Sequence, residues 1–390
     1  MAETAPCPPP PSWSDIPPEL AGLVLRRLPA YADRVRFAAV CPQWRAAARQ
    51  GRLPPPLPLL VLPDGTAYSL PGSKSFRHPA CAGYTDACGN WLFFSNEDGC
   101  FLRDPFLNAT VTLPALSLYR VRHVGDEPVG EADLARMEVE EGKKLNACKL
   151  MFCSPHLIAA IVILGRSTRI AVCQPGAASW WSVSVDRWSP QFVDLAFHQG
   201  KLYVLTSGVD ILCAVDIIVD QNTGDPWVSQ IRQVINGCLA CPYLLMNEFL
   251  ILKMCYLVEL RGKLLAVCRK INFWWTEGRF PVVSSEQNKF VVFEADFGQS
   301  QWVKVTTIGS DQVLFLRRRC CRSFCVSHNE MPGDRIFFME NDEEDHRWYD
   351  KESSSSCSVY DMRDGKVSTP LPGISWECGT VLATWLFPQD

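Results

Sequence analysis

A proline-rich run, Leu53 to Pro58, divides this chain into two parts with different sequence patterns. Proline fixes φ and has no backbone N–H, so neither a helix nor a central strand is expected to continue through this run. We therefore expect residues 53–58 to form an extended, semi-rigid linker. A second run, Pro8 to Pro11, predicts that residues 1–12 form a disordered tail.

The segment before the linker predicts three short helices. Asp15 can accept hydrogen bonds at the start of a helix that begins near Ile16, and Pro29 ends that helix. Further helix starts are expected at Asp33 and Pro42. One apolar stripe on the first helix, with spacing i, i+3, i+4 and i+8, is made by Leu20, Leu23, Val24 and Leu28.

So small a helical unit has too much surface for its volume to bury all of its large apolar side chains internally. Two explanations fit the residues themselves. Either the helices pack as an N-terminal cap on the rest of the chain, or part of their apolar surface binds another protein.

This segment resembles the F-box, whose pattern is Leu-Pro-x-Glu-Leu, a run ending in Arg-Leu, and a close of Arg-x-x-x-Val-Cys-x-x-Trp-Arg. The matching residues are Ile16, Pro17, Glu19, Leu20, Arg27, Leu28, Arg36, Val40, Cys41, Trp44 and Arg45. The chain departs from the pattern where Ile16 replaces leucine and where Pro42 replaces a basic residue. The resemblance implies docking on a Skp-type adaptor, which joins the segment to a cullin and RING ubiquitin ligase. We expect an adaptor-facing set, some of it in the module's own small core, of Ile16, Pro17, Leu20, Val24, Leu28, Val40 and Trp44.

After the linker, helical periodicity gives way to short runs rich in β-branched and aromatic residues, separated by Gly, Pro, Asp and Asn. The expected strands include Trp91–Ser95, Ile158–Leu164, Arg169–Cys173, Lys201–Leu205, Ile211–Val215, Lys263–Val267, Phe290–Glu294 and Arg335–Met339. Two units recur: a Gly-Lys turn entering a strand, at Gly200 and Gly262, and a Trp-bearing strand, at Trp181 and Trp302. Irregular blades of a β-propeller show such units. A pair of packed sheets would give similar strand signals.

The β body resembles the plant F-box family whose C-terminal region is a divergent, kelch-like propeller. The matching blocks are residues 101–106, 113–114, 192–203, 256–259, 290–293, 302–305, 314–316 and 335–338. The chain departs from the family where Arg317 replaces Gly and where Cys325 interrupts a Ser-rich stretch. The expected fold class is therefore α+β multidomain, with a small three-helix F-box (residues 13–52) followed by a mainly β propeller (residues 59–388).

Charge and hydropathy exclude some partners. The chain has a net charge of −4, but its F-box segment holds seven arginines against three acidic residues, so the remainder carries −8. An acidic body argues against nucleic acid as the main partner. The longest wholly apolar run, Leu157 to Leu164, is far shorter than the ~20 residues that cross a bilayer, so no membrane span is expected. The 18 cysteines without a signal-type N-terminus predict reduced thiols in an intracellular protein, in cytoplasm or nucleus.

The common sequence motifs for catalysis, cofactor binding and metal binding are missing from the chain. The chain has no Gly-x-Ser-x-Gly elbow, P-loop, His-Glu-x-x-His or Gly-x-Gly-x-x-Gly. Its one Cys-x-x-Cys pair, Cys238 and Cys241, has no second pair at zinc-finger spacing. We expect no catalytic residue, cofactor or metal, and we expect the basic triplet Arg317 to Arg319 to be a solvated strand end.

These features together predict a substrate-receptor subunit of a Skp–cullin–F-box (SCF-type) ubiquitin ligase. The F-box would bind the adaptor, the propeller would bind an unknown protein substrate, and the isopeptide chemistry would belong to the partners. Two alternatives stay open. One is a propeller scaffold whose F-box serves stability or adaptor sequestration without ubiquitination, and the other is a propeller enzyme, because fold does not decide function.

Overall fold

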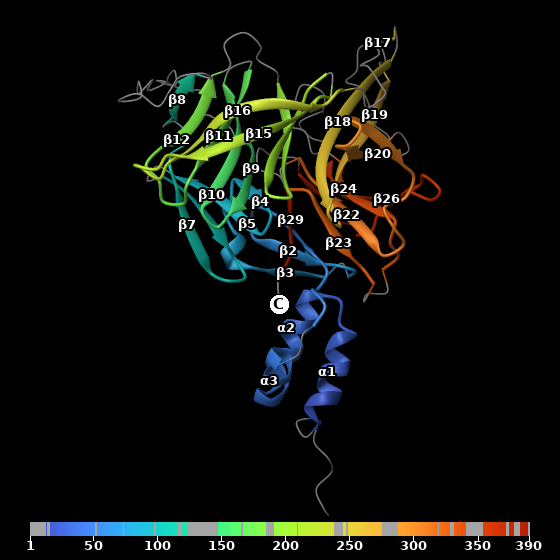
Figure 1. Ribbon diagram of the computed structural model, residues 1–390. Coiled ribbons are helices and arrows are strands. Elements are labelled where there is room, and N and C mark those ends of the chain that lie inside the picture. Colours follow the sequence, from blue (N-terminus) through green and yellow to red (C-terminus); the bar gives the residue numbers. More distant parts are fainter. Residues whose placement is uncertain are drawn as a thin grey trace, which may run out of the picture.

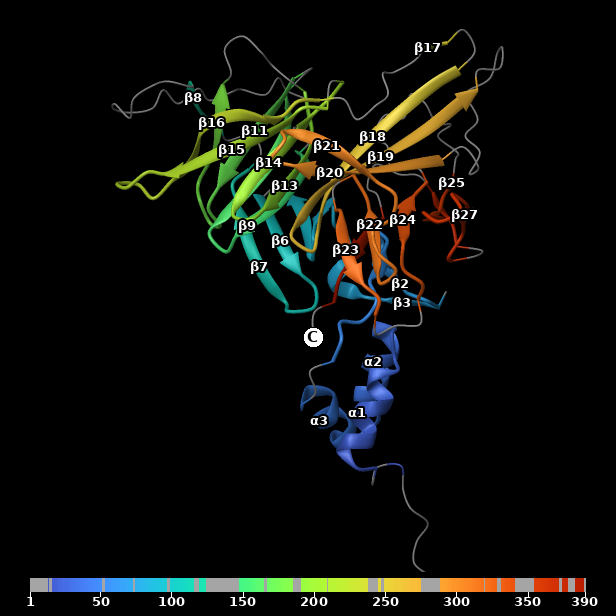
Figure 2. The same cartoon turned by 45° about the vertical axis from the view of Figure 1, so that its right-hand side comes forward.

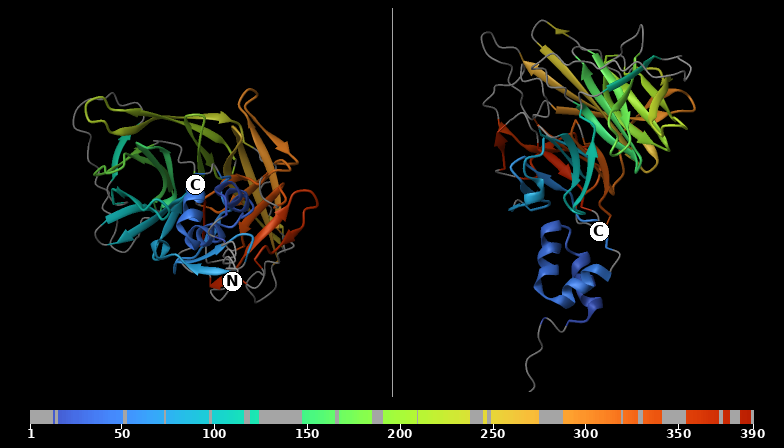
Figure 3. Two further views of the ribbon diagram at one scale, coloured as in Figure 1. Left: turned by 90° about the horizontal axis from the view of Figure 1, so that it is seen from below. Right: turned by 90° about the vertical axis from the view of Figure 1, so that its left-hand side faces the viewer.

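The computed structural model describes residues 13, 16–50, 53–72, 74–96, 99–115, 119–123, 147–164, 167–184, 191–208, 210–237, 245–246, 249–274, 288–318, 320–327, 331–340, 354–371, 374–377 and 383–388. In these ranges, three helices lead into a ring of six four- or five-stranded sheets (Figure 1). The helices lie against one face of the ring, near the C-terminal end of the chain (Figures 2 and 3). The predicted tail, residues 1–12, lies outside the described residues.

The three helices follow the predicted order, but not every predicted start. Their bounds are α1 (Pro18–Arg26), α2 (Tyr31–Val40) and α3 (Pro42–Gln50). The start at Pro42 is confirmed, whereas the start expected at Asp33 is wrong because α2 begins two residues earlier. Ala30 precedes α2 in an extended conformation and forms a parallel bridge with Leu57, so a contact with the linker sets this helix start. The expected cap of α1, Asp15, lies outside the described residues.

The first blade joins the two ends of the propeller. Its strands are β29 (Thr384–Leu386), β1 (Leu59–Val61), β2 (Thr66–Ser69) and β3 (Ser75–Arg77), in that order across the sheet. The last strand of the chain pairs antiparallel with the first, and Trp385 lies opposite Leu60. This pairing closes the ring, which removes the long open edges that an unclosed sheet would present.

The other five blades follow in chain order. The second blade contains β4 (Asp86–Cys88), β5 (Trp91–Asn96), β6 (Gly99–Asp104) and β7 (Ala109–Leu113), preceded by a short 3₁₀ helix, η2 (Pro79–Cys81). The third contains β9 (Ala147–Ser154), β10 (Leu157–Leu164), β11 (Ser167–Cys173), β12 (Trp180–Ser184) and the parallel edge strand β8 (Tyr119–His123). The fourth contains β13 (Phe192–His198), β14 (Lys201–Thr206), β15 (Leu212–Val219) and β16 (Pro226–Ile235).

The fifth blade contains the longest strands, and the sixth contains a parallel strand pair. The fifth contains β17 (Leu245–Met246), β18 (Phe249–Leu260), β19 (Lys263–Trp274), β20 (Asn288–Asp296) and β21 (Gln301–Val305). The sixth contains β22 (Gln312–Leu316), β23 (Arg322–Cys325), β24 (Arg335–Met339), β26 (Cys357–Asp361) and β27 (Val367–Ser368). A two-stranded sheet is formed by β25 (Ser354–Ser355) and β28 (Trp376–Glu377).

The repeated sequence units occupy equivalent places in different blades. Gly200 and Gly262 each stand in the two-residue turn between the first two long strands of a blade, and each follows a residue that also has a positive φ. Two successive positive φ angles are what a tight hairpin of matching twist requires. The Trp-bearing strands are β12 and β21, which follow the third long strand of their blades. Each of the eight expected strands overlaps an observed strand, namely β5, β10, β11, β14, β15, β19, β20 and β24. The propeller is thus confirmed over the packed pair of sheets.

Each pair of neighbouring blades shares a hydrophobic cluster, so the core is distributed around the ring. Blades one and six meet at Phe315, whose ring stacks on Phe337 at 4.6 Å and meets Trp385 edge-on at 4.9 Å. Aromatic pairs at such distances add to the energy of area burial. Ring closure therefore rests on side-chain packing as well as on the β1–β29 strand pair.

Charged side chains are buried along the innermost strands. Lys149 on β9 forms an ion pair with Asp194 on β13, and the same carboxylate accepts a 2.6 Å hydrogen bond from the backbone N–H of Leu257 on β18. Blades three, four and five are thereby joined.

Arg317, expected at a solvated strand end, is instead buried, and that prediction is wrong. Burial raises the pKa of the Tyr84 phenol, and the Arg317 guanidinium opposes this rise because it favours the phenolate.

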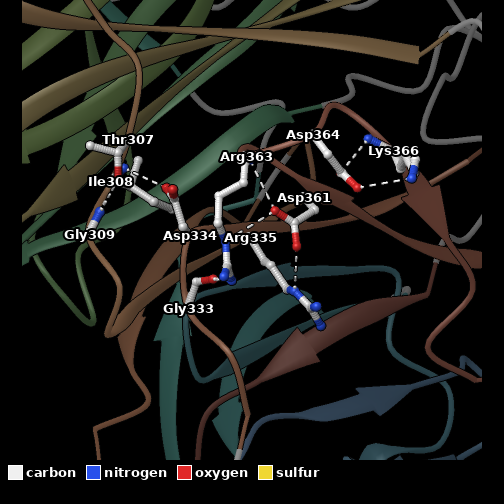
Figure 4. Close-up of polar contacts among 10 residues, drawn as sticks. All are labelled: Thr307, Ile308, Gly309, Gly333, Asp334, Arg335, Asp361, Arg363, Asp364 and Lys366. Carbon is white, nitrogen blue, oxygen red and sulfur yellow. Dashed lines mark hydrogen bonds and ion pairs between the residues drawn. The ribbon is translucent and has the colours of Figure 1, made fainter.

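A polar corner fixes the entry to the sixth blade (Figure 4). The carboxylate of Asp334 accepts a 2.9 Å hydrogen bond from the backbone N–H of Ile308, which lies on the connection from the fifth blade. Nearby, Asp361 lies between Arg335, at 3.2 Å, and Arg363, at 3.4 Å. Arg363 also donates to the carbonyl of Gly333 at 2.9 Å. These bonds tie the start of β24 to the end of β26.

Candidate protein-binding surface

The F-box helices enclose a small core of their own. The side chains buried in it are Ala21, Leu25, Phe37 and Ala47. Phe37 of α2 stacks on Trp44 of α3 with ring centroids 4.3 Å apart, which holds these two helices together. Leu25 is completely buried, so α1 presents the face around Leu25 and Ala21 to its neighbours.

A second side of α1 is apolar and exposed. Leu20 is 53% exposed, and Leu23 and Val24, which follow at i+3 and i+4, are similarly open. Residues with this spacing lie on one helix face. Val35 and Val40 on α2 are exposed as well. Large apolar side chains that the described part of the chain leaves exposed are typical of a surface that binds another protein.

The structure divides the predicted adaptor-facing set into two groups. The exposed members are Pro17, Leu20, Val24 and Val40, and the members packed against the F-box core are Ile16, Leu28 and Trp44. Sequence reasoning left out three exposed apolar residues, Trp13, Leu23 and Val35. A signal for Leu23 was present, because it belongs to the apolar stripe of α1. The adaptor-facing role of the set stays a prediction.

The junction between the F-box and the propeller is built from specific contacts. Arg34 is buried and donates to the carbonyl of Leu28 at 2.8 Å and to that of Pro54 at 2.7 Å. Tyr31, at the start of α2, meets the ring of Phe106 in the second blade edge-on at 5.3 Å. Burial raises the pKa of the Tyr31 phenol, so this ring stays neutral at physiological pH.

The linker is packed at both ends. Leu53 lies against the F-box core, and Leu57 is buried in the cluster shared by the first and sixth blades. The backbone N–H of Leu57 also donates to the carbonyl of Pro29 at 2.8 Å. The linker therefore fixes the position of the helices relative to the propeller and does more than separate the two parts.

The buried cysteines of the propeller are poorly suited to nucleophilic chemistry. Burial raises the pKa of Cys81 to about 12 and that of Cys213 to about 11, which disfavours the nucleophilic thiolate. Within the described ranges, no group of three or more His, Cys, Asp or Glu side chains is placed to hold a metal ion. The Cys238 and Cys241 pair lies outside those ranges. None of the described helices is long and apolar enough to cross a membrane.

Comparisons with known proteins agree with this architecture. The F-box domain profile matches residues 13–54, and the profile described as the KIB1-4 beta-propeller matches residues 59–361. The F-box protein At2g26160 of Arabidopsis thaliana is 22% identical over 361 residues, which cover 85% of this chain and 96% of that protein. The F-box protein SKIP23 of Arabidopsis thaliana is 24% identical over 402 residues, which cover 91% of this chain and 90% of that protein. Because the propeller profile spans well over half of its length, the chain belongs to the KIB1-4 beta-propeller family and carries an F-box domain before the propeller.

Proposed function

We propose that this protein is a substrate-receptor subunit of an SCF-type ubiquitin ligase. An F-box domain implies binding to a Skp1-type adaptor, and families that join an F-box to a propeller are typically non-catalytic substrate receptors. In the proposed complex the F-box binds the adaptor, the adaptor brings the cullin and RING subunits, and the propeller binds a protein substrate. These partners would act together in the cytoplasm or nucleus.

The observation that carries this proposal is the uncovered apolar face of the F-box. Leu20, Leu23 and Val24 share a helix face that the propeller leaves open. This supports the second of the two explanations open from the sequence, in which another protein covers the apolar surface. The packed junction at Tyr31 and Arg34 supports the same function, because it would hold a substrate on the propeller at a fixed place relative to the adaptor. Such positioning raises the effective concentration of substrate lysines near the conjugating enzyme.

Leu20→Asp tests the adaptor surface. An unpaired carboxylate in an apolar contact costs about 3 kcal/mol, which corresponds to a loss of about 100-fold in affinity for a purified Skp-type adaptor, measured by calorimetry. Val219→Asp is the matched control, because Val219 is equally exposed, at 53%, but lies on the propeller. It should leave adaptor binding unchanged. Equal affinity of wild type and Leu20→Asp, with both proteins folded by circular dichroism, would contradict the assignment.

A second experiment separates a ligase subunit from an adaptor-sequestering scaffold. The tagged protein is purified from cells treated with a proteasome inhibitor, and its partners are identified by mass spectrometry. We expect the adaptor and a cullin together, with ubiquitinated proteins enriched over the Leu20→Asp sample. Recovery of the adaptor without a cullin would support the scaffold and would refute the ligase role.

A further inference from the structure

Two cysteines face each other in the fifth blade. Cys255 on β18 lies directly opposite Cys268 on β19 in the antiparallel register, and their Sγ atoms are 2.9 Å apart. Opposed residues in an antiparallel pair have Cα atoms about 4.5–5.5 Å apart, which falls within the range that a disulfide spans, about 4.4–6.8 Å. Strand register therefore places the two cysteines at a separation that a disulfide can span.

The two thiols differ in access. Cys268 is fully buried, whereas Cys255 is only partly buried, at the edge of the core cluster that the fourth and fifth blades share. The ammonium group of Lys253, two residues along the same strand, interacts favourably with a Cys255 thiolate and is itself paired with Asp210 of the fourth blade. Cys255 is therefore the more accessible of the two thiols, and Cys268 is available mainly to its neighbour.

We propose that Cys255 and Cys268 are a redox modification site, which a small soluble disulfide such as oxidised glutathione converts to an intramolecular disulfide. In the first step the Cys255 thiolate attacks one sulfur of glutathione disulfide, that S–S bond breaks, and one glutathione thiolate leaves. In the second step the Cys268 thiolate attacks Cys255 Sγ in the mixed disulfide and releases the second glutathione. The two protein sulfurs are oxidised, the two glutathione sulfurs are reduced, and the two thiol protons end on glutathione. This inference does not depend on the proposed ligase function.

The groups around Cys255 also determine how fast its exchange with glutathione disulfide should be. The hydrogen bond between the two thiols and the burial of Cys255 raise its pKa, whereas Lys253 opposes this rise. Little thiolate is therefore present at neutral pH, so exchange should be slow there and should accelerate as the pH rises. An exposed cysteine with an ordinary pKa would react faster with the same reagent.

Peptide mapping gives a direct test. Trypsin releases the two cysteines in separate peptides, residues 254–261 and 264–269, each of which contains a single cysteine. The full-length protein is equilibrated anaerobically in glutathione buffers from reducing to oxidising, quenched in acid, alkylated and digested. We expect a disulfide-linked pair of these two peptides to appear as the buffer becomes oxidising and to disappear after dithiothreitol treatment.

Variants report the order of the steps. In Cys268→Ser, the peptide 254–261 should accumulate as its glutathione adduct, because the second thiol is missing. In Cys255→Ser, the peptide 264–269 should stay unmodified, because Cys268 is buried. Cys213→Ser, which removes a buried thiol of the neighbouring blade, is the matched control and should leave the linked pair of peptides unchanged.

The peptide map of the wild-type protein tests the proposed disulfide even if a variant fails to fold. Separate alkylation of both peptides at every glutathione ratio, while circular dichroism shows a folded protein, would overturn the proposal. So would a linkage of Cys255 mainly to some other cysteine of the chain.

Discussion

The ion pair of Lys149 and Asp194 should be among the most sensitive points of the propeller. Both side chains are almost completely buried, and the pair joins the inner strands of two blades. The Asp194 carboxylate also accepts hydrogen bonds from the backbone N–H groups of Leu195, at 2.8 Å, and Leu257, at 2.6 Å. Asp194→Ala therefore removes the partner of a buried cation and the acceptor of two backbone donors in a single change.

The cost of Asp194→Ala follows from these contacts. Removing one member of a buried ion pair costs about 3–5 kcal/mol, because the other charge stays buried without compensation. An N–H group of Leu257 without an acceptor adds about 1–3 kcal/mol. The combined loss is about 4–8 kcal/mol. The free energy of unfolding of a typical protein is only about 5–15 kcal/mol, so this loss is a large part of it. We expect the variant to be partly unfolded or close to it at 37 °C.

The variant should also gain a characteristic pH dependence. Burial by itself would lower the pKa of Lys149, but the Asp194 carboxylate, together with Cys321 and Cys320, outweighs burial and raises it. Without that carboxylate the effect of burial, which is the largest single influence on Lys149, dominates, so the pKa of Lys149 in the folded variant should fall below its unfolded value. The unfolded state then binds more protons than the folded state, so the stability of Asp194→Ala should increase as the pH rises from 7 toward about 10.

Urea unfolding followed by tryptophan fluorescence measures these effects. Asp216→Ala is the control, because Asp216 forms an exposed ion pair with Arg232 at 2.8 Å and its loss should cost far less. The double variant Lys149→Met/Asp194→Ala should recover part of the loss, because no buried charge remains. If Asp194→Ala unfolds at the same urea concentration as Asp216→Ala, the stabilising role of the buried pair is refuted.

Two further predictions concern the sixth and fourth blades. A Cβ atom at Gly333 would lie 2.3 Å from the backbone carbonyl oxygen of Ser310, so Gly333→Ala should cost about 1–3 kcal/mol in urea unfolding. Gly72→Ala, whose Cβ would make only an ordinary 3.7 Å contact, should cost much less, and equal losses would contradict the steric argument. The hydrogen bonds from Arg232 lower the pKa of Asp216, so this carboxylate contributes stability above its unfolded pKa of about 3.9 and loses that contribution as the pH falls through its lower folded value. The difference in Tm between wild type and Asp216→Asn should therefore shrink as the pH falls below about 4, and a difference that stays constant with pH would contradict the pKa shift.

The sequence did not predict which side of α1 is exposed or where α2 begins, because both depend on the neighbours of each helix. The spacing of Leu20, Leu23 and Val24 correctly places them on one side of α1, but spacing alone does not tell whether that side is covered. The structure covers the side that carries Leu25 and leaves the leucine and valine stripe open. The start of α2 was missed for a similar reason, since a bridge from Ala30 to the linker sets it.

Local backbone preferences and side-chain periodicity in the sequence predicted the helical start at Pro42, the places of the expected strands and the repeated turns. Packing between blades, by contrast, closes the ring of six blades through β1 and β29, buries Arg317 and brings Lys149 to Asp194. Lys149 and Asp194 are 45 residues apart in the chain and lie on different blades. Such a contact between blades forms only when separate strands pack around a common axis, so no local sequence pattern predicts it.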